Sequence, residues 1–132
     1  MDRTAYEPFY WEDVEWGWRA RKLGYRVVFC AKSIARHRQR STIARHYTEG
    51  EVEAVIARNR LLFQLRNFTT AGPVKRVIEE ICQSPCAVAQ DFLNWRVAGR
   101  IAKGRFWNRT AAISDEEVLG LQPVRQPEPC PR

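Results

Sequence analysis

The chain has 132 residues, of which 45% are hydrophobic; this is enough for one modest core and argues against two full domains. Its 22 Lys and Arg against 15 Asp and Glu give a net charge of +7, which favours acidic partners such as phosphates, nucleic acid or anionic lipid headgroups. No run of residues approaches the ~18 apolar positions of a membrane span, so we expect a cytoplasmic protein, or one that is peripheral to the inner membrane.

The four cysteines are predicted to be reduced thiols. Cys30, Cys82, Cys86 and Cys130 fall at irregular spacings, and no hydrophobic leader directs the chain into an oxidising compartment. Only Cys82 and Cys86 lie close together in sequence, and both histidines are far from them. A structural zinc site is therefore not expected.

The first third of the chain predicts a helix followed by a short two-strand element. Aromatic and apolar residues recur with helical spacing over residues 13–23, and Gly24 predicts the end of that helix. Residues 25–30, "YRVVFC", are β-branched and aromatic, which is typical of a buried strand. Residues 33–37, "SIARH", indicate a second, shorter strand. Together these elements predict an α/β fold at this end of the chain.

A long helix should follow. Thr48 and Glu51 form a capping box, which predicts that a helix begins there, and the pattern continues to about Asn67. We expect this helix to pack against the small sheet and to organise the core. Its apolar face consists of Val52, Val55, Ile56, Asn59, Leu62 and Phe63.

The remainder of the chain is predicted to be mostly helical. The segment "TTAGP" at residues 69–73 breaks the chain, and helical patterns follow at residues 74–82 and 86–103. A second capping box predicts a short helix over residues 115–121. The proline-rich residues 122–132 are expected to be disordered.

An adjacent pair of carboxylates, Glu12 and Asp13, stands at the start of the first helix. One interpretation is helix capping, because exposed N–H groups and the macrodipole favour acidic residues in a first turn. The other is general-base chemistry, in which a fixed carboxylate takes a proton from an attacking hydroxyl. Trp11, with Tyr10 before it, favours the second interpretation, since an aromatic face beside carboxylates commonly holds a sugar ring.

The order and spacing of several blocks resemble a known enzyme family. The blocks are "YWEDVEWGWRARKLGYRVVF", "HRQRST", "RNRLLFQLRNF" and the ending "RTAAISDEEVLGL". They are similar to the C-terminal part of the inverting family 2 glycosyltransferases, especially the bacterial rhamnosyltransferase-like members. The resemblance covers roughly residues 8–121, which is nearly all of the chain.

The resemblance implies the C-terminal portion of a GT-A, Rossmann-like catalytic domain that acts in polysaccharide biosynthesis. In this expectation residues 1–46 form the acceptor and base-bearing end of the catalytic domain, and residues 47–121 form a C-terminal helical region. Residues 122–132 form the tail. The reaction transfers a sugar from a nucleotide-diphosphate donor to a saccharide or lipid-linked acceptor with inversion.

The resemblance also implies roles for individual residues. Asp13 matches the general base, Glu12 is its partner in the catalytic pair, and Trp11 and Tyr10 are the candidate acceptor-binding residues. His37 matches a histidine that reaches the metal or the diphosphate in related enzymes. The candidate diphosphate-binding residues beside it are Arg36, Arg38 and Arg40.

Two features depart from the family pattern. Members often have glycines and a second histidine after the matched histidine, where this chain has "RQR". The sequence also contains no Asp-x-Asp, the motif that holds the divalent cation, magnesium or manganese, in the donor-binding half. We therefore expect the chain to be inactive alone and to meet its nucleotide sugar through a donor-binding half that lies outside this sequence.

Two rival interpretations remain. One is a basic helical module for an anionic membrane surface or for nucleic acid, although no recognisable nucleic-acid motif is present. The other is a vestigial fragment without activity. The basic stripe that supports the first rival consists of Arg96, Arg100, Lys103, Arg105 and Arg109, interleaved with Trp95, Phe106 and Trp107.

Overall fold

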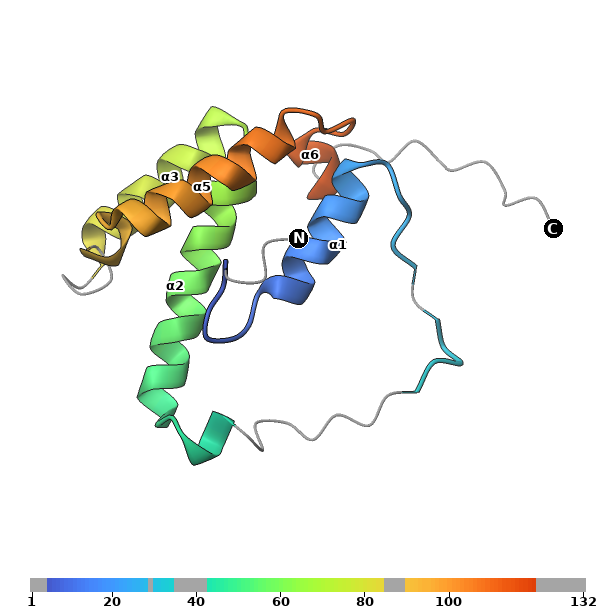
Figure 1. Ribbon diagram of the computed structural model, residues 1–132. Coiled ribbons are helices and arrows are strands. Elements are labelled where there is room, and N and C mark those ends of the chain that lie inside the picture. Colours follow the sequence, from blue (N-terminus) through green and yellow to red (C-terminus); the bar gives the residue numbers. More distant parts are fainter. Residues whose placement is uncertain (1–4, 29, 35–42, 85–89, 121–132) are drawn as a thin grey trace.

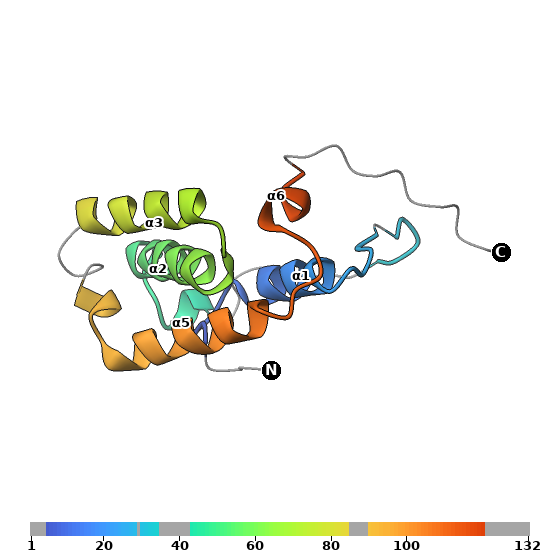
Figure 2. The same cartoon turned by 90° about the horizontal axis from the view of Figure 1, so that it is seen from above.

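The computed structural model describes residues 5–28, 30–34, 43–84 and 90–120, and these residues form helices joined by loops. The long helix α2 lies at the centre, with α3 and α5 on its two sides, while α1 and α6 lie together near one end of α2 (Figures 1 and 2). No helix in the described part of the chain is long and apolar enough to cross a membrane. The α-helices are α1 (Glu12–Lys22), α2 (Glu49–Asn67), α3 (Ala71–Gln83), α5 (Trp95–Asn108) and α6 (Asp115–Val118), and a 3-10 turn spans Ile43–Arg45.

The predicted α/β fold with a two-strand element is wrong for the described residues, which contain no strand and no sheet. Residues 25–28 have no regular secondary structure, and Val27 and Val28 are 61% and 68% exposed. The preference of β-branched residues for strands reflects packing and pairing within a sheet. The described residues offer this segment no neighbouring strand, so its composition alone does not make it one.

The predicted end of α1 and the predicted starts of α2 and α6 are confirmed, because these boundaries depend on local contacts. Gly24 adopts a φ of 87° directly after α1, and its N–H donates to the carbonyl of Arg21 at 2.9 Å. The next N–H, from Tyr25, donates to the carbonyl of Ala20, which completes a Schellman ending. The capping box of Thr48 and Glu51 at α2 and that of Ser114 and Glu117 at α6 are both present.

The segment at residues 69–73 was predicted to interrupt the chain, but it contains the start of α3. Thr70 is the N-cap and Ala71 the first helical residue, so Pro73 lies in the first turn. Proline is tolerated there because a first-turn N–H has no partner within the helix. The helix predicted over residues 86–103 is observed only in part: residues 90–92 form a helical turn, the chain breaks at residues 93–94, and α5 then runs from Trp95 to Asn108. Residues 85–89 lie outside the described part of the chain.

The hydrophobic core lies where α1 and the loop before it meet α2. Phe63 and Leu62 of α2, buried to 5% and 1% exposure, pack with Trp18 of α1 and with Tyr6 of the preceding loop. The expectation that these α2 residues cover a sheet is thus corrected, since their partners are a helix and a loop. Trp16 lies on the same helix as Trp18 but is 56% exposed, so the aromatic residues of α1 do not all join the core.

Helices α2 and α5 approach each other closely at Gly104. A Cβ atom at this position would lie 2.8 Å from the Cβ of Arg66 on α2, which is closer than side chains tolerate. Asn108, one turn further along α5, donates a hydrogen bond of 3.1 Å to the carbonyl of Arg66. The close approach therefore seats α5 against the C-terminal end of α2.

Candidate active site

The loop that leads into α1 holds two consecutive residues in the left-handed region. Tyr10 has a φ of 69° and Trp11 a φ of 81°, a conformation that costs non-glycine residues free energy unless surrounding contacts stabilise it. Asn59, fully buried on α2, provides such contacts. Its Nδ2 group donates to the carbonyls of Tyr6 at 2.9 Å, Phe9 at 2.8 Å and Tyr10 at 3.3 Å.

The neighbouring Arg58 also holds this loop. Its guanidinium donates to the carbonyl of Glu7 and to the Oδ1 atom of Asn59, the latter at 2.9 Å. The adjacent pair Arg58-Asn59 therefore fixes the backbone path that leads to the carboxylates. The sequence predicted Asn59 only as one position on the apolar face of the helix; a polar side chain within that face was the signal that it binds something buried.

Glu12 and Asp13 occupy the first turn of α1, and both are exposed. Trp11 occupies the N-cap position without a side-chain capping bond, and Glu12 and Asp13 lie in the first turn, where the exposed N–H groups and the helix dipole favour carboxylates, as the first interpretation expects. One oxygen of Asp13 accepts a 2.8 Å hydrogen bond from the N–H of Val14. Within the described residues its other oxygen has no hydrogen-bond partner, which leaves it open to a ligand.

Trp11 and Tyr10 stand next to the carboxylates but are only half-exposed. The indole of Trp11 packs against the ring of Phe63 with centroids 5.4 Å apart, and Tyr10 meets the ring of Phe9 edge-on at 5.1 Å. One face of Trp11 therefore belongs to the core. The role of these rings in binding an acceptor stays a prediction.

The other predicted site residues lie outside the described part of the chain. These are His37 and its neighbours Arg36, Arg38 and Arg40. Among the described residues, no group of three or more His, Cys, Asp or Glu side chains is placed to hold a metal ion. Of the described cysteines, Cys30 and Cys82 are exposed and form no disulfide.

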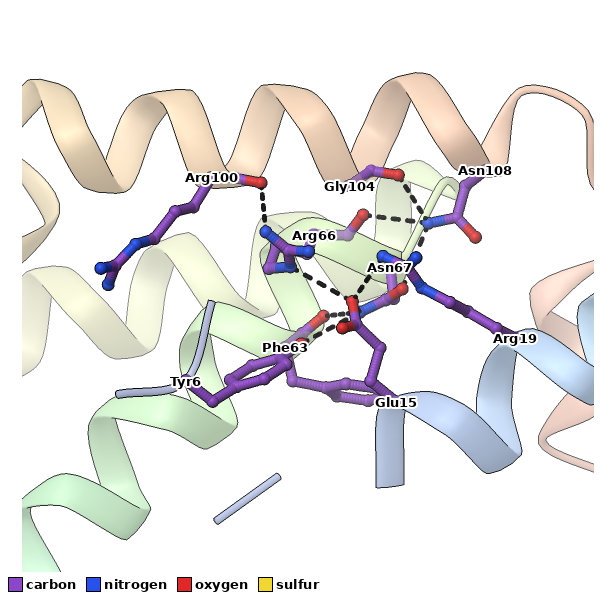
Figure 3. Close-up of polar contacts among 9 residues, drawn as sticks. All are labelled: Tyr6, Glu15, Arg19, Phe63, Arg66, Asn67, Arg100, Gly104 and Asn108. Carbon is purple, nitrogen blue, oxygen red and sulfur yellow. Dashed lines mark hydrogen bonds and ion pairs between the residues drawn. The ribbon is translucent and has the colours of Figure 1, made fainter. Parts of the chain in front are cut away.

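Beneath the loop, Figure 3 shows a network of buried polar side chains that the sequence interpretation missed. Glu15 of α1 is 3% exposed, and its Oε1 atom accepts from Arg66 Nε at 3.2 Å and from Asn67 Nδ2 at 3.2 Å. Arg19 adds a third contact to the same oxygen at 2.9 Å. The spacing of Glu15 and Arg19, four residues apart on one helix face, was the signal available in the sequence.

The network sets the rotation of α1. Because Glu15 points into the interface with α2, Asp13, two residues or about 200° earlier on the helix, points away from it. Burial, followed by the charge of Glu15, raises the pKa of the Tyr6 hydroxyl well above its ordinary value. Tyr6 is therefore neutral and contributes a hydrogen-bonding group rather than a charge beneath the loop.

A second buried ion pair closes the other end of α1. Lys22 Nζ lies 2.6 Å from Asp115 Oδ1, and the two side chains are 2% and 0% exposed. Asp115 Oδ2 also accepts from the backbone N–H groups of Thr69 at 2.6 Å and Thr70 at 3.0 Å. Asp115 thereby joins the end of α1 to the connection between α2 and α3.

The predicted basic stripe on α5 is partly used for packing. Arg105 donates to the carbonyl of Leu65 at 3.1 Å, and Trp107 lies under the guanidinium of Arg19 at 4.6 Å. Phe106, in contrast, is 74% exposed. The role of this helix at an anionic surface stays a prediction.

Within the described residues, the geometry thus places the exposed carboxylates of Glu12 and Asp13 at the start of a helix, after a loop that contacts with α2 hold in position. Comparisons of the chain with protein families, with curated proteins and with solved structures found no match. The case for a function therefore rests on the chemistry of the chain's own residues.

Proposed function

We propose that the chain carries the acceptor side of an inverting glycosyltransferase, with Asp13 as the general base. The observation that carries this proposal is the exposed Asp13 carboxylate, with one oxygen unpartnered among the described residues, at the end of a loop held by Asn59. The resemblance of the blocks around Glu12-Asp13 and Arg58-Asn59 to the family 2 enzymes supports it. The proposal concerns the reaction and not the α/β fold, which the described residues do not adopt.

In the proposed reaction the acceptor hydroxyl lies against Asp13. The carboxylate takes the hydroxyl proton while the acceptor oxygen forms a bond to the anomeric carbon of the donor sugar. The bond between that carbon and the nucleotide diphosphate breaks, and the diphosphate leaves from the opposite face with both electrons, which inverts the configuration. Glu12 orients the acceptor or the base from the same turn of α1.

The restrained loop suits this role. A base accelerates proton transfer only when it lies within hydrogen-bond reach of the proton it removes. The contacts of Asn59 with three loop carbonyls and the contact of Glu15 with Arg66 hold α1 in position and rotation. Acceptor binding then requires little ordering of the carboxylate itself.

In this proposal, residues outside this sequence bind the divalent cation and the donor nucleotide. The described residues do not supply a donor set for such a cation, so no step is derived through it. The isolated chain is accordingly expected to bind no nucleotide sugar. Calorimetry with UDP- and dTDP-sugars in the presence of manganese checks this, and micromolar binding would mean that the donor site lies within the chain.

Asparagine in place of Asp13 tests the base directly. It keeps a hydrogen-bond acceptor for the N–H of Val14, so the free energy of unfolding should change by less than ~1 kcal/mol. It cannot accept the proton, so turnover by the chain combined with a donor-binding half should fall at least ~100-fold, with donor affinity nearly unchanged. Initial rates and donor titrations measure the two quantities.

Two further variants serve as controls in that assay. Glu12→Gln should be milder than Asp13→Asn if Glu12 only orients, and Glu116→Gln, on α6 beside the opposite end of α1, should leave turnover unchanged. Full turnover in Asp13→Asn together with loss in Glu12→Gln would assign the base to the other member of the pair. Activity in both variants would show that the reaction does not pass through this turn.

A further inference from the structure

A cavity of 190 Å³ lies between α2 and the beginning of α5, apart from the exposed carboxylates of α1. Its apolar lining comes from Leu62 of α2, from Phe92 in the helical turn at residues 90–92, and from Val97 of α5. Arg58, Arg96 and Arg100 contribute three guanidinium groups, and Asp91 contributes one carboxylate. The lining therefore carries an excess of positive charge over an apolar floor.

The arginines reach this cavity from two helices. Arg96 and Arg100 are four residues apart, so they lie on the same face of α5. Arg58 lies on the facing helix α2 and is half-buried. Asn94, the N-cap of α5, is also part of the lining, so the positive end of the helix dipole lies at the cavity.

The hydrogen bonds of Arg58 leave its charge without a paired carboxylate. Within the described part of the chain it donates only to neutral acceptors, the carbonyl of Glu7 and the side-chain oxygen of Asn59. Burial lowers the pKa of Arg58; the charge of Asp91 opposes this, and that of Arg100 adds to it. Asp91 thus compensates the charge of Arg58 more than Arg100 opposes it, and a bound anion would add a hydrogen-bonded negative charge to both guanidiniums.

Arg100 is only weakly compensated. Its NH2 group lies 3.4 Å from Glu7 Oε2, and the side chain of Glu7 is 58% exposed. Exposed ion pairs at such distances contribute little stability and exchange readily with other anions. A ligand with a second negative charge would compete well with Glu7 for this guanidinium.

We propose that this cavity is a binding site for a phosphate group. Guanidinium groups bind phosphate oxygens through pairs of parallel hydrogen bonds, which makes arginine suited to this ligand. The apolar floor of Leu62, Phe92 and Val97 accommodates the organic part of a phosphorylated molecule and keeps water from the ion contacts. The lining includes neither Glu12 nor Asp13, although Arg58 also holds the loop before α1, and the proposal does not depend on the proposed glycosyl transfer.

Isothermal titration of the full chain with inorganic phosphate and with pyrophosphate tests the site. Arg100→Gln and Arg96→Gln should each weaken binding about tenfold, the effect of losing one charge-assisted hydrogen bond. Asp91→Asn removes the carboxylate of the cavity and should tighten binding severalfold. Arg76→Gln removes the same charge from an exposed position on α3 and should leave affinity unchanged.

Circular dichroism and thermal melting verify that each variant is folded. Equal losses in Arg76→Gln and Arg100→Gln would show binding to the overall positive charge and would overturn the proposal, as would no binding of any probe. Sedimentation with phosphatidylcholine vesicles, with and without phosphatidic acid, distinguishes the source of the phosphate. Arg100-dependent binding to free phosphate assigns the site to a soluble ligand, whereas Arg100-dependent binding to vesicles alone assigns it to a lipid headgroup.

Discussion

Replacing Asp115 by alanine should lower the free energy of unfolding by about 3 to 5 kcal/mol, the usual cost of removing one partner from a buried ion pair. The substitution leaves Lys22 charged and 1% exposed, with the carbonyl of Ile113 as its remaining acceptor at 2.9 Å. It also removes the acceptor for the N–H groups of Thr69 and Thr70. Urea denaturation followed by circular dichroism measures the change.

Two comparisons isolate the ion pair from other effects of this substitution. Glu116→Ala removes a neighbouring, half-buried carboxylate that forms no ion pair among the described residues, and it should cost less than about 1 kcal/mol. Adding Lys22→Met to Asp115→Ala removes the unpaired charge and should restore part of the lost stability. Wild-type stability in Asp115→Ala would show that the ion pair of Lys22 and Asp115 is not buried as described.

The pH dependence of stability provides an independent measure of the same pair. Burial would raise the pKa of Asp115, but Lys22 and the N–H groups of Thr70 and Thr69 outweigh it and hold this pKa below its ordinary value. The stabilisation is therefore fully present above the unfolded pKa of about 3.9. It is lost as the pH falls through the lower folded value, so acid should destabilise the wild type more steeply than Asp115→Ala.

Replacing Phe63 by alanine should cost about 3 to 5 kcal/mol, the range for deleting a buried aromatic ring. The Phe63 ring lies 5.4 Å from the ring of Trp11, 5.7 Å from that of Trp18 and 6.3 Å from that of Phe68, measured between centroids. The cavity left behind would be lined by three aromatic rings that cannot all move inward. Chemical denaturation followed by tryptophan fluorescence measures the loss.

Phe106 provides the matched control for Phe63. It is a phenylalanine on a helix of the same bundle but is 74% exposed, so Phe106→Ala should change stability by less than about 0.5 kcal/mol. A similarly small loss in Phe63→Ala would contradict the core described here. Trp11 packs on Phe63, so Phe63→Ala removes support from the loop before α1 while it leaves the Asp13 carboxylate in place.

The sequence alone determined those helix ends that carry a local capping signal. The capping boxes at Thr48 and Ser114 and the glycine after α1 involve residues within five positions of one another. Such contacts form wherever the local chain is helical, and they do not require knowledge of distant neighbours. The adjacent pair Glu12-Asp13 could likewise be placed in the first turn of a helix from the sequence.

Whether the segment after α1 forms a strand, and which polar side chains are buried, depends on the packing of the helices and could be seen only in the folded structure. A strand requires a partner for its backbone groups, and residues 25–28 have none in the described part of the chain. Glu15 and Arg66 are 51 positions apart in the chain, so the sequence around neither residue identifies the other as its buried partner. Burial of a charge is tolerated only when a distant partner meets it, and that meeting is a property of the packed helices.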